Sequence, residues 1–185
     1  MESLAQAISN YLFSEKEGRA FAVLDGASIP GLLENLYHYQ PEHVCLYRGE
    51  LEPDMAEVAP YLVALEPNTQ FTGWVLEQGW GKHWGVFVIS PADLRALRQH
   101  FRTFLIVHNS GGQPLYFRYY DPRVLRVYLP TCNVQELATV FGPVVSYLVE
   151  DADPNTLLCF RTVSGALRQE KIPLALGSVK PVGVR

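Results

Sequence analysis

Residues 114–131 constrain the fold most, because an aspartate and a proline divide this segment into two kinds of structure. Its aromatic part, residues 116–120, is typical of a half-buried strand. Pro122 cannot donate a hydrogen bond to a sheet, but it fits the first turn of a helix, and Asp121 before it is a good N-cap. The pattern therefore predicts a strand, a capping aspartate and a short helix that ends at Pro130.

Arg118 lies within the predicted strand and has two interpretations. A strand over residues 116–120 would place Arg118 on the outer face, where Tyr120 flanks it on one side and another tyrosine on the other. An arginine between two tyrosine rings is typical of a stacking or recognition site. In the alternative, Asp121 holds Arg118 or Arg123 in a purely structural corner at the helix start.

Short apolar runs alternate with capped helical patterns along most of the chain. Runs such as 21–24, 61–65 and 86–89 are uniformly apolar and predict buried strands. Ser90 followed by Pro91 is typical of a helix start. Helices and strands alternate early and hairpins follow later. We therefore expect an α/β (α+β) fold: a mixed β-sheet with helices packed on its faces and a C-terminal β-hairpin.

The 185 residues suit one domain, which we expect to span residues 1–163. Glycines and prolines interrupt residues 164–185, so these residues are expected to form a partly ordered tail.

Composition excludes several function classes. A hydrophobic content of 48% supports a packed core, and a formal net charge of −4 without a basic stripe argues against nucleic-acid binding. No segment approaches the roughly 20 apolar residues that span a bilayer, and the N-terminus lacks the basic residues of a secretory signal. Three widely spaced cysteines suit a reducing compartment. We therefore expect a cytoplasmic protein without membrane insertion.

Motifs for catalysis, metals and cofactors are absent from the sequence. No two histidines, and no histidine and cysteine, share helical ligand spacing, and there is no phosphate-binding loop, nucleophile elbow or dinucleotide fingerprint. No metal, cofactor or catalytic activity is expected. The alternative is a small hydrolase or transferase that uses His83 as a base with a nearby carboxylate such as Asp25 or Asp121.

Aromatic residues gather at turns and strand ends, above all in residues 80–85, where two tryptophans and two glycines surround a histidine. Tryptophan, tyrosine and arginine dominate the binding energy of protein interfaces. We therefore predict a partner-binding surface, and the residues expected to lie near it or to shape it are Trp80, His83, Trp84, Arg118, Tyr120, Asp121 and Arg123. In the alternative, the aromatic residues line the core with their polar atoms at its edge.

The order and spacing of several short motifs resemble a known family. These are AVLDGA (22–27), LYRGELE (46–52), APYLV (59–63), GWGKHWG (79–85), SPADL (90–94), FRYYDPRVL (117–125) and FGPV (141–144). Over about residues 20–160, the chain is similar to bacterial type VI secretion effector chaperones (adaptors), long known only as a domain of unknown function.

This resemblance implies a cytoplasmic adaptor that binds a toxic effector protein and helps load it onto the spike protein of the secretion machine. It implies neither catalysis nor a cofactor. Longer members often carry a second, largely helical lobe, so a chain of this length is expected to be a short member or to bind by one face. A purely structural subunit of the same machine is a further alternative.

Overall fold

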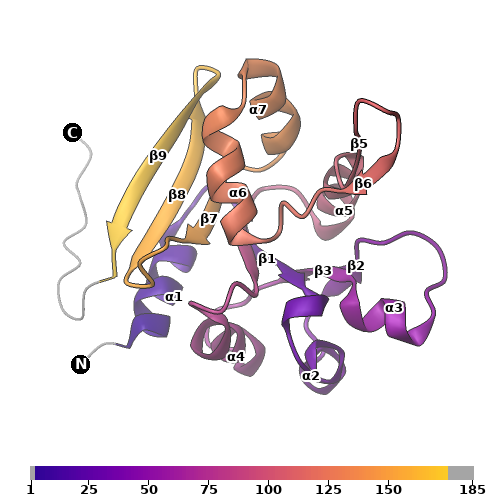
Figure 1. The fold of residues 1–185 in the computed structure, drawn as a ribbon. Coiled ribbons are helices and arrows are strands. Elements are labelled where there is room, and N and C mark those ends of the chain that lie inside the picture. The colour runs from indigo at the N-terminus through magenta and orange to yellow at the C-terminus, as the bar shows by residue number, and fades with distance from the viewer. Residues whose placement is uncertain (1–2, 175–185) are drawn as a thin grey trace.

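A seven-stranded β-sheet with helices on both faces forms the body of the protein (Figure 1). The computed structural model describes residues 3–174. The strands of this sheet are β1 (Arg19–Asp25), β2 (His43–Cys45), β3 (Pro60–Ala64), β4 (Gly85–Ser90), β7 (Ser146–Glu150), β8 (Thr156–Val163) and β9 (Ala166–Pro173). A separate two-stranded hairpin consists of β5 (Ile106–His108) and β6 (Pro114–Tyr116).

Helices connect most of these strands. They are α1 (Leu4–Ser14), η1 (Gly26–Ser28), α2 (Leu32–Tyr39), α3 (Pro53–Val58), α4 (Gln70–Gly79), α5 (Leu94–Thr103), α6 (Pro122–Tyr128), η2 (Leu129–Thr131) and α7 (Val134–Phe141). Side chains at the N-caps satisfy backbone N–H groups at several helix starts. At the start of α7, the Asn133 side chain accepts a hydrogen bond from the backbone N–H of Glu136. The Glu136 carboxylate accepts one from the backbone N–H of Asn133, and the two bonds form a capping box.

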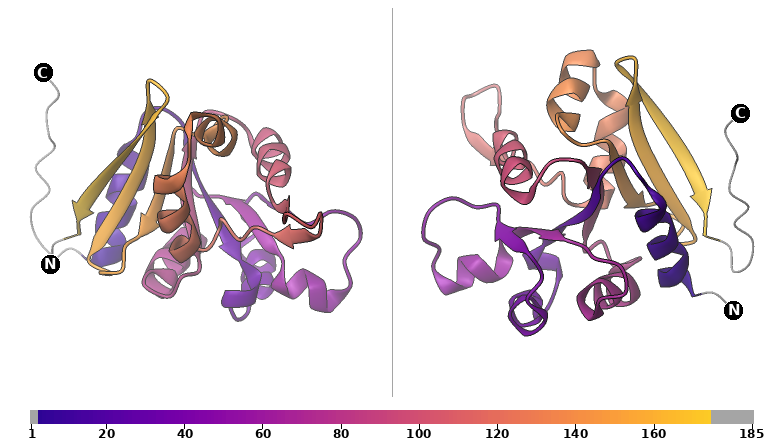
Figure 2. Two further views of the ribbon diagram at one scale, coloured as in Figure 1. Left: turned by 45° about the horizontal axis from the view of Figure 1, so that its top comes forward. Right: turned by 180° about the vertical axis from the view of Figure 1, so that it is seen from behind.

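The sheet order is β2-β3-β1-β4-β7-β8-β9, and every described pair of neighbours is antiparallel. Successive β1 residues face opposite layers. Ala22 and Leu24 pack with α1, α2 and α4, whereas Phe21 and Val23 pack with α5, α6 and α7. Figure 2 shows the two helical layers from further directions. Because both faces are covered, all residues of β3 and β7 are buried.

The α+β class, the helices on the sheet faces and a C-terminal hairpin are confirmed. The sequence also predicts a mixed sheet, and here every described strand pair is antiparallel. Uniformly apolar strands indicate burial on both faces, which is typical of parallel strands. In this fold, two helical layers provide the same burial to antiparallel strands.

The prediction of a strand over residues 116–120 is wrong beyond its first residue. Strand β6 ends at Tyr116, and the chain then turns, with the Asp121 N–H donating to the Arg118 carbonyl oxygen at 3.0 Å. Tyr119 and Tyr120 are both buried, so the alternation of a strand is lost. The chain must return here from the exposed hairpin to the body, where Asp121 and Pro122 begin α6 as predicted.

The expectation of a tail from residue 164 is also wrong for most of the described part. Strand β9 pairs with β8 along its whole length, through a turn in which Ser164 and Gly165 both have positive φ. Two such residues are typical of a tight hairpin turn, so Gly165 joins two strands and does not end the ordered structure. Leu174 after β9 is buried, and residues 175–185 lie outside the described residues.

Candidate functional site

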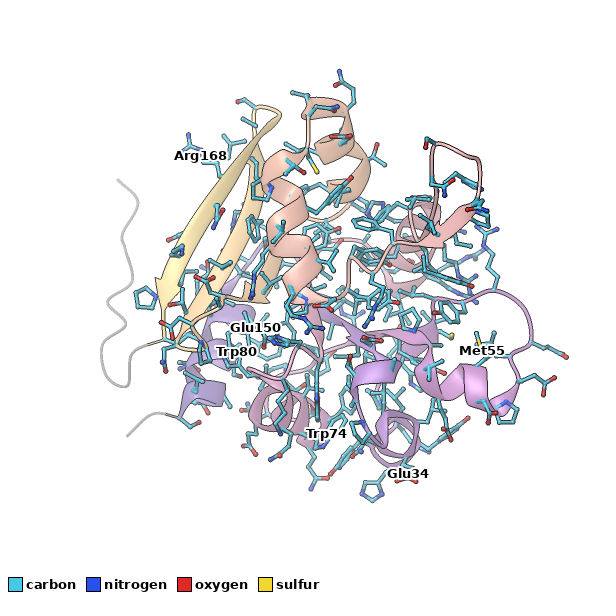
Figure 3. All side chains as sticks on the ribbon, in the orientation of Figure 1. Glu34, Met55, Trp74, Trp80, Glu150 and Arg168 are labelled. Carbon is cyan, nitrogen blue, oxygen red and sulfur yellow. The ribbon has the colours of Figure 1, made fainter. Side chains whose placement is uncertain are left out.

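The predicted site residues meet at one end of the sheet, where β1 and β7 end and β4 begins. Antiparallel pairing of β1 with β4, and of β4 with β7, brings Asp25 and Glu150 to this end. The turn formed by residues 80–84 enters β4 here. Figure 3 labels Trp80 and Glu150 at this position. Residues distant in the sequence therefore surround the same strand ends.

The carboxylate of Glu150 organises the turn of residues 80–84. This buried side chain accepts from the N–H of Gly81 at 2.5 Å and from the N–H of His83 at 3.0 Å, and it also contacts the Nδ1 atom of the His83 ring. Gly81 and His83 both have positive φ, so the turn is tightly bent. Glu150 thus supplies partners for backbone donors that the turn cannot satisfy itself.

The two tryptophans of this turn have different positions. Trp80 is half-buried, and its indole Nε1 donates to the Pro154 carbonyl oxygen at 2.6 Å. Trp84 is buried in the core, where its ring centroid lies 4.8 Å from that of Trp74. A Cβ atom added at Gly79 would lie 2.6 Å from the Trp84 ring. The placement of Trp84 on the surface is therefore wrong, because its ring fills the space that this glycine leaves.

Arg118 forms an ion pair with a buried aspartate other than Asp121. Its Nη2 lies 2.5 Å from Oδ2 of Asp25, which also accepts from the Ser28 hydroxyl at 2.7 Å. The other oxygen of Asp25 caps η1 by accepting from the Ala27 N–H at 3.2 Å. Burial disfavours the charged form of Arg118 and acts to lower its pKa. The charge and the hydrogen bond of Asp25 together have the larger effect, so the pKa of Arg118 is raised.

Asp121 and Arg123 form a structural corner at the start of α6, as in the alternative interpretation of this segment. Asp121 is buried and caps α6, and its two oxygens accept from Arg123 Nε at 3.0 Å and Nη2 at 2.7 Å. Burial raises the pKa of Asp121, but the hydrogen bonds from Arg123 outweigh it and lower the pKa overall. Asp121 is therefore a support beneath the surface rather than an exposed contact.

Tyr120 is also buried, so its predicted place on the surface is wrong. Burial raises the pKa of its hydroxyl group. This hydroxyl group lies close to the hydroxyl group of Tyr47. The neighbouring Tyr119 is fully buried and donates to the Phe101 carbonyl oxygen at 3.1 Å. These two tyrosines confirm the alternative in which aromatic residues line the core.

His83, Arg118 and Arg123 share a common arrangement. The exposed fraction is 34% for the His83 side chain, 46% for Arg118 and 52% for Arg123, and each contacts a buried carboxylate. Both Glu150 and Asp25 help raise the pKa of Arg123, after the larger effect of Asp121. We call the following set the strand-end surface: Trp80, His83, Arg118 and Arg123, supported by Asp25, Asp121 and Glu150.

The predicted site does not include Glu150, and Asp25 enters the predictions only as a possible carboxylate beside a catalytic His83. Each is an acidic residue at the end of an apolar run, at residues 21–24 and 144–149, and such a position is the available signal. The partners of these carboxylates come from other elements, so local patterns could not assign them. Figure 3 shows Glu150 below α6, from which the Arg126 Nη1 donates to the Glu150 carbonyl oxygen at 3.2 Å.

The cavity beside Glu150 is small, whereas one of about 240 Å³ lies next to Gly26 and Ala27, which follow β1. The cavity lined by Trp80, Trp84 and Glu150 has a volume of about 10 Å³, roughly the room needed by one water molecule. A cavity of about 560 Å³ lies at the opposite end of β1, where Arg19 pairs with Glu42 and Glu66. Within residues 3–174, no group of three or more potential ligand side chains could hold a metal ion, and no helix is long and apolar enough to cross a membrane.

Comparison with curated proteins and with solved structures finds no match. A family model described as "Domain of unknown function (DUF4123)" matches residues 20–139. The matched part runs from β1 into α7 and includes Asp25, His83, Arg118 and Asp121, but not Glu150. The match covers more than half of the chain, and the protein therefore belongs to the DUF4123 family.

Proposed function

We propose that this protein is an adaptor that binds a type VI secretion effector protein in the cytoplasm and helps load it onto the spike protein, without catalysing a reaction. The motif order described above suggests this role. The observation that carries the proposal is the strand-end surface, in which aromatic and cationic side chains are half-exposed above buried carboxylates.

The buried carboxylates prepare this surface for binding. Arg118 and Arg123 are each held from below, so little side-chain entropy remains to be lost when a partner binds. Arginine and tryptophan are enriched among the residues that dominate interface energies. A typical interface buries about 800 Å² on each partner, so these side chains would form the centre of a larger contact.

The test is a pull-down from a bacterium that secretes the effector, with the double variant Arg118→Lys/Arg123→Lys. Lysine keeps the charge above the buried acids but loses the planar arrangement of donors. We expect retention of effector and spike protein to fall about tenfold or more. The matched control is Arg19→Lys, whose ion pairs with Glu42 and Glu66 lie at the opposite end of β1. A folded double variant that retains both proteins at wild-type levels would contradict the proposal.

One observation favours the second candidate, a small hydrolase or transferase. The contact between His83 Nδ1 and Glu150 resembles the way an acid orients a catalytic base. However, Glu150 also binds two backbone N–H groups, and the cavity that it lines is too small for a substrate. An enzyme of this kind should turn over an activated ester such as p-nitrophenyl acetate and lose that activity in His83→Gln, whereas an adaptor should show no turnover in either form.

A further inference from the structure

Helix α5 and the β5–β6 hairpin differ in charge from the rest of the chain. Residues 94–120 contain four arginines and no acidic residue, which leaves eleven basic and nineteen acidic residues for the rest of the protein. Asp25 binds Arg118. Arg95, Arg98 and Arg102 form no salt bridge with any residue that the structure describes. This segment therefore carries positive charge that the fold does not neutralise locally.

The three arginines of α5 are spaced so that they follow one side of the helix. Arg102 donates to the carbonyl oxygens of Cys45 at 3.1 Å and Leu46 at 2.9 Å, and to that of Tyr47, none of which carries a formal charge. Burial and then repulsion from Arg98 lower the pKa of Arg102. Within the described chain, the Nε atom of Arg98 is buried without a hydrogen-bond partner. An external anionic group beside Arg98 would offset the repulsion between the two guanidinium groups.

The β5–β6 hairpin next to α5 exposes apolar side chains on both faces. The exposed fractions are 46% for Ile106, 39% for Val107, 50% for Leu115 and 56% for Tyr116. Figures 1 and 2 show this hairpin projecting from the body beside α5. In the described residues it pairs with no other strand, so its outer edges keep free backbone groups. This hairpin contacts the body through Tyr116, whose ring centroid lies 5.2 Å from that of Tyr47. A two-stranded hairpin alone is marginally stable in water, and a partner would add to its stability.

We propose that α5 and the β5–β6 hairpin bind an acidic, apolar segment of a partner protein. Carboxylates of that segment would pair with Arg95 and Arg98, and its apolar side chains would cover Leu115 and Tyr116. This inference deepens the proposed function and rests on it, since it takes the partner to be a polypeptide. We call Arg95, Arg98, Ile106, Val107, Leu115 and Tyr116 the hairpin surface.

The open strand edges favour a protein over an anionic membrane as the occupant. A peptide backbone can pair with the free N–H and C=O groups of β5 or β6, whereas a lipid surface offers no such donors and acceptors in register. Planar guanidinium groups also match carboxylates with two parallel hydrogen bonds.

The test is a selection of short random peptides, displayed on phage, against the immobilised full-length protein. We expect the recovered sequences to be enriched in Asp or Glu beside apolar residues. Recovery should fall about tenfold or more on the variants Leu115→Asp and Arg95→Glu. The matched controls Val134→Asp and Arg168→Glu make the same changes at exposed positions in α7 and β9, and should leave recovery unchanged.

Three outcomes would overturn the inference: no enriched peptides, enrichment of basic peptides, or equal recovery on Leu115→Asp. A membrane role is tested in parallel by sedimentation with vesicles of phosphatidylglycerol and phosphatidylcholine. Binding to the anionic vesicles that is lost in Leu115→Asp, without acidic peptides in the selection, would replace the protein partner with a lipid surface. The selection uses neither effector nor spike protein, so its failure is distinct from failure of the pull-down.

Discussion

The strand-end surface and the hairpin surface both present arginines, but they differ in what lies beneath. At the strand ends, Arg118 and Arg123 are paired with buried aspartates, and His83 contacts a buried glutamate. On the hairpin surface, Arg95 and Arg98 form no such pair in the described chain. Residues of the first surface therefore support the fold as well as any binding, whereas we expect residues of the second to contribute less to stability. Stability measurements can test this difference.

The largest loss of stability is expected for Glu150→Ala. This change removes the acceptor for the N–H groups of Gly81 and His83 and leaves both without a partner at a partly buried turn. An unsatisfied buried donor costs about 1–3 kcal/mol. His83 is half-buried and Gly81 exposed, so we expect the free energy of unfolding to fall by up to about 3 kcal/mol in urea titrations. The control Glu77→Ala, an exposed residue of α4, should change it little. Equal effects of the two variants would show that Glu150 does not support the turn.

Gly79→Ala should produce the next largest effect, because its new methyl group would lie against the Trp84 ring. Overpacking of this kind costs about 1–3 kcal/mol. Gly73→Ala is the matched control, since it lies in the same helix and a Cβ atom there meets nothing within 4 Å. The control should be neutral or stabilise the protein by up to about 1 kcal/mol in thermal unfolding. If both variants behave alike, Trp84 does not fill the space at Gly79.

Asp121→Asn should cost about 1 kcal/mol at neutral pH, because it weakens the cap of α6 and removes the ion pair with Arg123. The pKa of Asp121 is lower in the folded protein than its ordinary value, so the carboxylate stabilises the fold fully above that value. This contribution is lost as the pH falls from about 5 through the folded-state pKa. The difference between wild type and Asp121→Asn in urea titrations should therefore shrink at acidic pH. A constant difference would exclude the ion pair as its source.

Leu115→Asp should have the smallest effect on stability, within about 0.5 kcal/mol, because Leu115 is 50% exposed and is not a member of either core cluster. Circular dichroism during thermal unfolding checks this expectation. A loss of stability comparable to that of Glu150→Ala would remove the contrast between the two surfaces.

Local sequence patterns predicted the elements better than their contacts. The start of α6 at Asp121 and Pro122 follows from two adjacent residues, and it was predicted correctly. The partner of Arg118 is Asp25, 93 residues away, and the contact of Glu150 with His83 spans 67 residues. Pairing at such distances depends on the sheet order, which the periodicity of single segments does not specify. The burial of Trp84 likewise depends on the glycine beneath its ring.

Strand β9 shows a second limit of sequence reasoning. Its polar residues, such as Arg168 and Lys171, do not resemble a buried strand, because β9 forms the edge of the sheet and is largely exposed. Hydrogen bonds to β8 stabilise this strand more than the burial of apolar side chains does. Charged residues on an edge strand also oppose unwanted pairing with other chains.

Amide hydrogen exchange of the full chain, alone and after co-purification with its effector, tests the central claim most directly. If the effector covers the strand-end surface, protection should increase in residues 80–84 and 118–123, and in residues 106–116 if the hairpin surface also binds it. Increased protection confined to the opposite end of β1, around Arg19 and the 560 Å³ cavity, would contradict the account.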